Sequence, residues 1–175
     1  VNTRQEIWHS NIPNEDYYTD SAFDMAFSVK NDIIVLRNMH NCYCYDFQGN
    51  YLWGQDGPGD NNRINMIGVS KDDGKVLITT NAPGVINVDL FNRDGSLFLE
   101  TEINLGPDCI FAANVTWVAD VFDNFVLIGF KAKVGHERKR VTGILYYNGS
   151  NWISAIIDGR WDLHKSAQGK YTLVG

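Results

Sequence analysis

The feature that most constrains the fold is a short hairpin motif that occurs three times along the chain. The motif reads YDFQGNYLWG from Tyr45, FNRDGSLFLE from Phe91 and YYNGSNWISA from Tyr146. In each copy an apolar and aromatic run leads into a polar turn with a glycine, and a second such run follows. Gly, Asn and Asp accept the tight backbone of a hairpin turn, so each copy predicts two antiparallel strands.

Each hairpin is the second half of a longer unit that contains two further strands. An apolar strand, a polar turn and a strongly apolar second strand precede the hairpin. No helical periodicity interrupts these strands. The chain is therefore predicted to be all-β and a single domain over residues 1–175, with repeats at 21–54, 63–100 and 109–155. Four antiparallel strands that recur every 40 to 50 residues or so are typical of β-propeller blades.

Two segments carry a resemblance to a known superfamily. The segments SKDDGKVLITT from Ser70 and LFNRDGSLFLE from Leu90 are similar to the repeat of quinoprotein-like β-propellers, and SAQGKYTLVG from Ser166 matches its first half again. The chain departs from tryptophan–aspartate-repeat propellers, because its Trp161–Asp162 pair lies in an innermost-strand position. The resemblance implies a fold and no activity, since propellers carry many unrelated functions.

The two ends of the chain are predicted to complete one further blade. Residues 160–175 supply an inner and a second strand, and residues 1–11 contain an outer strand, TRQEIWHSN. Pairing of these strands would close a four-bladed ring without exposed edges. The alternative is an excerpt from a larger ring of about six to eight blades. A four-bladed ring is narrow, so its centre is expected to be filled by Phe23, Met25, Met66 and Phe111.

Charge limits the classes of partner. The net charge is −6 and the isoelectric point is about 5.1, so nucleic acid is not expected as a partner and a basic protein is favoured. The basic run KAKVGHERKR from Lys131 to Arg140 is expected to be a solvated hairpin tip. No apolar run is long enough for a membrane span, so no membrane partner is expected.

Acidic residues gather on the crossings between the predicted blades, which the topology places on one face. Glu102 is among these acids. Aromatic residues anchor interfaces and acids steer the encounter with a cationic partner. The partner-binding residues predicted from this pattern are Glu15, Asp16, Tyr17, Tyr18, Asp20, Asp56, Asp60, Asp108 and Asp158.

The three cysteines do not form a disulfide framework. His40, Cys42 and Cys44 occupy every second position of a strand, so they share one face. Three ligands spaced in this way along an extended strand cannot easily surround one ion. We therefore expect reduced core thiols and no metal or cofactor. Free thiols are typical of a reducing compartment, so the cytoplasm is expected. A cell-surface or secreted location would apply if the chain is an excerpt.

No catalytic motif is present, so the function expected is non-catalytic protein binding. The specific form is an acidic inhibitor of the immunity type, which neutralises a basic partner such as a toxin nuclease. The alternative is a fragment of a larger quinoprotein-like propeller that acts as an enzyme or an extracellular scaffold. A longer native reading frame would favour the alternative.

Overall fold

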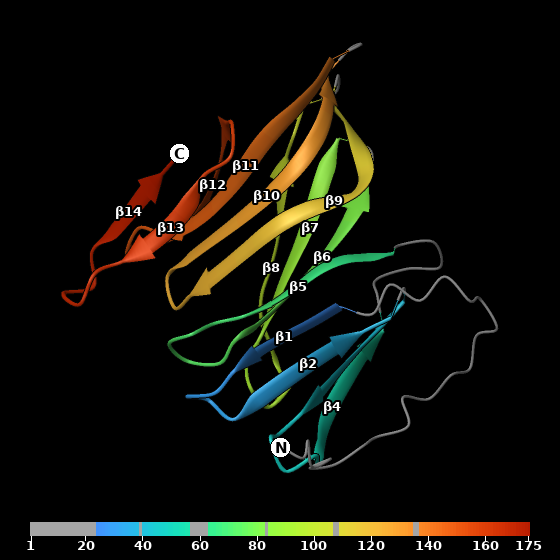
Figure 1. Ribbon diagram of the computed structural model, residues 1–175, viewed down its shortest axis with the longest axis vertical. Helices are drawn as coiled ribbons and strands as arrows, with labels where there is room; N and C mark the ends of the chain where they lie inside the picture. Colours follow the sequence, from blue (N-terminus) through green and yellow to red (C-terminus); the bar gives the residue numbers. More distant parts are fainter. Residues whose placement is uncertain (1–23, 39, 57–62, 83, 107–108, 135–136) are drawn as a thin grey trace, which may run out of the picture.

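The computed structural model describes residues 24–38, 40–56, 63–82, 84–106, 109–134 and 137–175. Within these ranges the regular elements are all β-strands (Figure 1). No helix of the described part is long and apolar enough to cross a membrane.

The strands form three four-stranded sheets and one hairpin, in chain order. Sheet 1 contains β1 (Asp24–Ser28), β2 (Ile33–Arg37), β3 (Asn41–Tyr45) and β4 (Tyr51–Asp56). Sheet 2 contains β5 (Ile64–Val69), β6 (Val76–Ala82), β7 (Val85–Phe91) and β8 (Leu97–Asn104). Sheet 3 contains β9 (Cys109–Phe122), β10 (Phe125–Val134), β11 (Glu137–Tyr147) and β12 (Trp152–Asp158). The terminal hairpin contains β13 (Asp162–Lys165) and β14 (Tyr171–Val174).

The connections inside each sheet are the hairpins that the sequence predicts. Strands that are neighbours in the chain pair in antiparallel fashion throughout. The turn glycines Gly49, Gly95 and Gly149 have φ angles of 88°, 84° and 98°. Glycine adopts these left-handed angles at little cost, which explains its place in the repeated motif.

Apolar cores join each sheet to the next. Val35, Cys44 and Trp53 of sheet 1 pack with strands β5 and β6 of sheet 2. A second core fills the space between sheets 2 and 3, and a third fixes the terminal hairpin on sheet 3 through Leu127 and Leu163. Alternate residues of a strand face opposite sides, so sheet 2 can contribute one face to each of its neighbours.

The first strands of successive units lie next to each other. β5 contacts both β1 and β9, and β13 contacts β9. Figure 1 shows β1, β5 and β9 in this order along the molecule. Sheets packed in chain order through their first strands are compatible with a propeller-like fold.

The expected filling of the centre is wrong for one residue. Met66 is buried, with 4% of its surface exposed, but Met25 is 58% exposed. Met25 pairs with Leu36 on the face of sheet 1 that is turned away from sheet 2, whereas Ala26 on the opposite face packs against the core. Phe23 and the side chain of Phe111 lie outside the described residues.

The two thiols of β3 are core residues, as expected. Cys42 and Cys44 are both free and both fully buried. Burial raises the pKa of the Cys44 thiol to about 12 and raises the pKa of Cys42 further. Both thiols are therefore protonated at neutral pH and unreactive in the folded chain.

Candidate functional site: an acid-lined cleft on sheet 2

The predicted acidic docking face is described at two of its positions. Asp56 is the last residue of β4, and its Oδ1 accepts a hydrogen bond of 2.6 Å from Asn41 Nδ2. Asp158 is the last residue of β12 and is exposed. The two belong to sheets 1 and 3, with sheet 2 between them. The remaining predicted positions lie outside the described residues: Glu15, Asp16, Tyr17, Tyr18, Asp20, Asp60 and Asp108.

The prediction for Glu102 needs a correction. The sequence places this residue on a crossing between units, but it lies inside β8, paired with Asn87 of β7. The ladder between β7 and β8 continues to Asn104, because the polar side chains of the outermost strand remain in solvent while the backbone pairs. Glu102 therefore belongs to a sheet surface and not to a loop.

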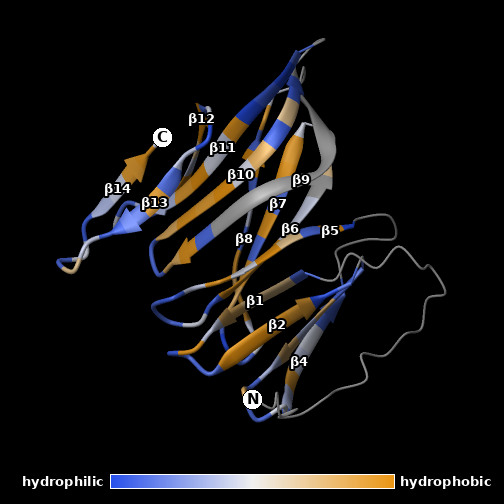
Figure 2. Ribbon diagram, viewed as in Figure 1, coloured by the Kyte–Doolittle hydropathy of each residue, from blue (hydrophilic) through white to orange (hydrophobic). Residues whose placement is uncertain are grey.

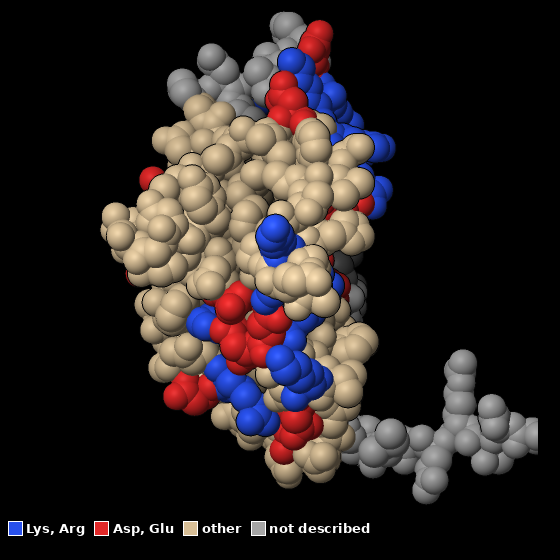
Figure 3. Space-filling model, turned by 90° about the vertical axis from the view of Figure 1, so that its left-hand side faces the viewer, with Lys and Arg blue, Asp and Glu red and all other residues tan. Residues whose placement is uncertain are grey.

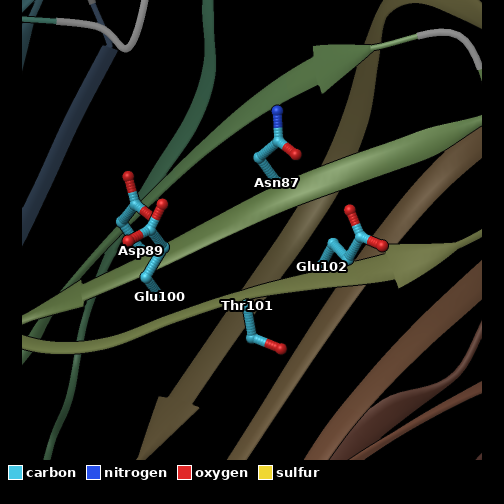
Figure 4. Close-up of a pocket in the computed structure, with 5 residues that line it drawn as sticks. All are labelled: Asn87, Asp89, Glu100, Thr101 and Glu102. Carbon is cyan, nitrogen blue, oxygen red and sulfur yellow. The ribbon is translucent and has the colours of Figure 1, made fainter.

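Glu102 is one of the residues that line a cleft with a volume of about 470 Å³. The lining residues that the structure describes come from the two outer strands of sheet 2: Asn87 and Asp89 from β7, and Glu100, Thr101 and Glu102 from β8. Asn87 lies opposite Glu102, and Asp89 lies opposite Glu100. Figure 4 shows these four side chains projecting from one face of the sheet, with the carboxylates of Asp89 and Glu100 close together and Thr101 pointing the other way.

The face of sheet 2 that carries the cleft is apolar on its inner strands and polar on its outer strands. On β6, Ile78 belongs to the core shared with sheet 1, and the next residue on that face is Thr80. Thr80 is buried, and its Oγ1 accepts a 3.3 Å hydrogen bond from Asn87 Nδ2. The inner strands thus bury apolar groups, and the outer strands present an amide and three carboxylates to the cleft.

Within the described ranges, no cation compensates the negative charge of the cleft. Asp89 is half-buried, and burial together with the negative charge of Glu100 raises the pKa of its carboxyl group. In the part of the chain that the structure describes, no Lys or Arg forms a salt bridge with Asp89, Glu100 or Glu102. A cationic group that entered the cleft would relieve this repulsion, so the arrangement is suited to binding a positively charged side chain.

A second charged cluster has the opposite character, because its charges are paired internally. Lys165 Nζ lies 3.4 Å from Asp123 Oδ1 and also contacts the carboxylate of Asp72. The Tyr171 hydroxyl donates a 2.7 Å hydrogen bond to Asp123. The hydrogen bond to Asp72 raises the pKa of Lys165. Figure 3 shows this face of the molecule, where red and blue side chains are interleaved. The cluster joins sheets 2 and 3 to the terminal hairpin, which is a structural role.

The cleft could have been predicted from the spacing of polar residues in β7 and β8, whereas the position of acids between the repeats does not indicate it. Asn87 and Asp89 are spaced by two residues in one strand, and so are Glu100 and Glu102 in the next. Spacing by two places residues on one face. The register that brings the two pairs opposite each other follows from the turn at Gly95, whose length fixes the alignment.

Comparison with models of protein families finds no match, and no curated protein matches the chain. The class of the protein is therefore described by its fold and its cleft. It is an all-β module built from consecutive four-stranded antiparallel sheets, with an acidic surface on its second sheet.

Proposed function

We propose that this chain is a non-catalytic protein-binding module that docks a cationic protein partner. The observation that supports the proposal is the cleft on sheet 2. Three carboxylates line this cleft, and among the described residues no Lys or Arg forms a salt bridge with them. The net charge of −6 acts in the same direction, because it attracts a basic partner over long range. The narrower form is an inhibitor of the immunity type that neutralises a basic protein such as a toxin nuclease.

The docking surface in this proposal combines the cleft with the acids of the crossings. Asp89, Glu100 and Glu102 receive a Lys or Arg of the partner, and the acids of the crossings steer its approach. Electrostatic steering acts mainly on the association rate, and a buried pairing in the cleft acts mainly on the dissociation rate.

The test compares two double variants that remove the same charge. Immobilised wild type captures its partner from the native host, and the captured protein is then measured for association and dissociation with each variant. Glu100→Gln with Glu102→Gln should weaken binding about tenfold or more. The matched control is Glu137→Gln with Asp162→Asn, which removes two exposed acids at other places and should change binding little.

Equal binding by wild type and the cleft variant would contradict the assignment of the cleft. A captured partner with an acidic isoelectric point would contradict the proposal as a whole.

We further propose that the chain of sheets closes into a four-bladed propeller of the quinoprotein-like kind. The terminal hairpin has two strands where the preceding sheets have four, and among the described residues no third strand pairs with β14. Residues 3–11 would pair with β14 and add a third strand to the fourth sheet. This arrangement would also cover the outward face of sheet 1, where Met25 and Phe27 are exposed.

A further inference from the structure

The last hairpin turn of sheet 3 is one residue shorter than the corresponding turns of the other sheets. In sheet 2, Asn92 N donates a hydrogen bond to Ser96 O and closes a turn of five residues, and sheet 1 and the terminal hairpin have the same arrangement. In sheet 3 the equivalent bond joins Asn148 N to Asn151 O and closes a turn of four residues. The shortening places the turn glycine, Gly149, directly after the first residue of the turn.

The amide of this glycine differs from the amides of the equivalent glycines. Gly49, Gly95 and Gly169 each donate their N–H to the carbonyl oxygen of the first residue of the turn, at 2.9 to 3.1 Å. Among the described residues, Gly149 N donates no hydrogen bond. Gly149 is also exposed, and no atom lies within 4 Å of the position of a Cβ. Its nitrogen is therefore open to water and hydroxide.

The side-chain amide of Asn148 is held by the same turn. Its Oδ1 accepts hydrogen bonds of 2.9 Å from Ser150 N and from Asn151 N. Two N–H groups on one carbonyl oxygen stabilise the negative charge that develops on the oxygen when a nucleophile adds to Cγ. Asn148 Nδ2 donates no hydrogen bond within the described ranges, so nothing there retains it as a leaving group.

Asn148 is also singled out by the residue that follows it. The chain contains one Asn-Gly pair, and every other asparagine precedes a residue with a side chain. A side chain on the following residue hinders the approach of its nitrogen to Cγ, whereas glycine does not and also permits more backbone angles. Figure 2 shows that hydrophilic residues occupy most of the turns that join the strands, but only this turn combines asparagine with glycine in direct succession.

We propose that Asn148 is a self-modification site, at which the side-chain amide deamidates to a mixture of isoaspartate and aspartate. Gly149 N gives its proton to hydroxide and bonds to Asn148 Cγ, the bond from Cγ to Nδ2 breaks, and Nδ2 leaves as ammonia after it takes a proton from water. The product is a cyclic succinimide, and hydroxide is regenerated. Water opens the ring at Cγ to give aspartate, or at the main-chain carbonyl carbon of Asn148 to give isoaspartate.

The modification changes the hairpin in two ways. Either product adds one negative charge to the net charge of −6. Isoaspartate also adds a methylene group to the main chain, directly beside the pair of Tyr147 and Trp152 that ends the ladder between β11 and β12. Trp152 lies against Phe98 of β8, with 6.3 Å between the ring centroids. Isoaspartate at this position therefore loosens a contact between sheets 2 and 3.

The experiment follows the full chain over time. The protein is produced in the bacterial cytosol, because the triplet Asn148-Gly149-Ser150 would accept an N-linked glycan in a secretory pathway. Folded protein is kept in mildly alkaline buffer for several weeks, digested at intervals and analysed by mass spectrometry. Isoaspartate and aspartate should accumulate at position 148, and ammonia should appear in equal amount. Asn92, the equivalent residue of sheet 2, is the internal control and should remain intact.

Two variants separate the contributions of the two residues. Gly149→Ala should slow the conversion about tenfold or more, because the added Cβ hinders ring closure. Asn148→Gln keeps the glycine and should remain unmodified over the same period, because its longer side chain closes a larger ring more slowly. Hydrogen exchange at the start of β12 should accelerate as wild type ages, in proportion to its isoaspartate content, and should stay constant in Asn148→Gln.

The proposal is overturned if Asn148 remains intact in the folded chain, whether or not an unfolded synthetic peptide of residues 144–153 converts. Conversion of the peptide alone would show that the folded turn protects the asparagine. The proposal also fails if Gly149→Ala converts as fast as wild type, or if Asn148→Gln releases as much ammonia, because another residue would then be the source. If Gly149→Ala does not fold, the comparison of wild type with Asn148→Gln decides the outcome.

Discussion

Trp53 shows how one residue can fix the position of two sheets. Its indole Nε1 donates a 2.8 Å hydrogen bond to the carbonyl oxygen of Arg93, which lies in the turn between β7 and β8. The ring also lies against Phe91, with 5.7 Å between the ring centroids. The turn that carries Gly95 is thus held against sheet 1 by a buried side chain whose polar atom is satisfied.

Replacement of the turn glycines should separate this packing effect from backbone strain. Gly95→Ala should destabilise the chain more than Gly149→Ala, although both residues have positive φ angles. A Cβ at Gly95 would lie 2.7 Å from Trp53 Cγ, whereas a Cβ at Gly149 has no atom within 4 Å. We expect a loss of about 1 to 2 kcal/mol at Gly149 from strain, and about 1 to 3 kcal/mol more at Gly95 from the clash.

Denaturant unfolding of the two variants measures this difference. Equal losses of free energy of unfolding would mean that Trp53 moves aside without cost, and the contact would then not fix the turn.

At the scale of the element, the strands and turns follow from local sequence and the strand ends do not. The polar turns contain Asn, Asp and Gly, which accept left-handed backbone, and the apolar runs between them alternate as strands require. The polarity of Glu102 and Asp158 predicts that they belong to crossings, but each lies in a strand, because an outer strand can pair while its side chains remain in solvent. The acid-lined cleft depends on that pairing, so it could not be found from polarity alone.

The terminal hairpin is the element whose attachment depends most on charge. Lys165 lies between the carboxylates of Asp72, in the turn between β5 and β6, and Asp123, in the turn between β9 and β10, and its ammonium group lies 5.4 Å from the centre of the Tyr171 ring. Leu163 N also donates a 3.4 Å hydrogen bond to Asp120 Oδ2. Removal of the ammonium group would leave two neighbouring carboxylates without the cation between them.

Lys165→Met should therefore loosen the terminal hairpin selectively. The methionine keeps most of the apolar stem, so the expected change comes from the lost charge. Hydrogen exchange of the amides of β13 and β14 should accelerate about tenfold or more, while exchange in sheets 1 and 2 stays unchanged. Lys170→Met, in the exposed turn of the same hairpin, is the control and should leave exchange as in wild type. Unchanged exchange in the Lys165 variant would show that the apolar contacts of Leu163 suffice.

At the scale of the molecule, the sheets cover one another in chain order, and the described residues leave a face uncovered at each end of the series. Sheet 2 is enclosed by sheets 1 and 3, and its inner strands are almost wholly buried. The outward face of sheet 1 exposes Met25 and Phe27, and Val174 at the end of β14 is 51% exposed. These exposed apolar groups are the positions against which a further element would pack if the ring closes.

Deletion of residues 1–10 tests whether that element is the start of the chain. If residues 3–11 pair with β14 and close the ring, their removal exposes the edge of β14 and opens the contact with sheet 1. The unfolding temperature should then fall by well over the shift of about 2 to 4 °C that accompanies a change of 1 kcal/mol in a chain of this size. Hydrogen exchange should also accelerate in β14 and in β1, which lie at the two uncovered ends, before it changes in sheet 2. A truncated chain with an unchanged unfolding temperature and unchanged exchange in β1 would contradict closure by the N-terminal strand. The succession of sheets would then remain without closure.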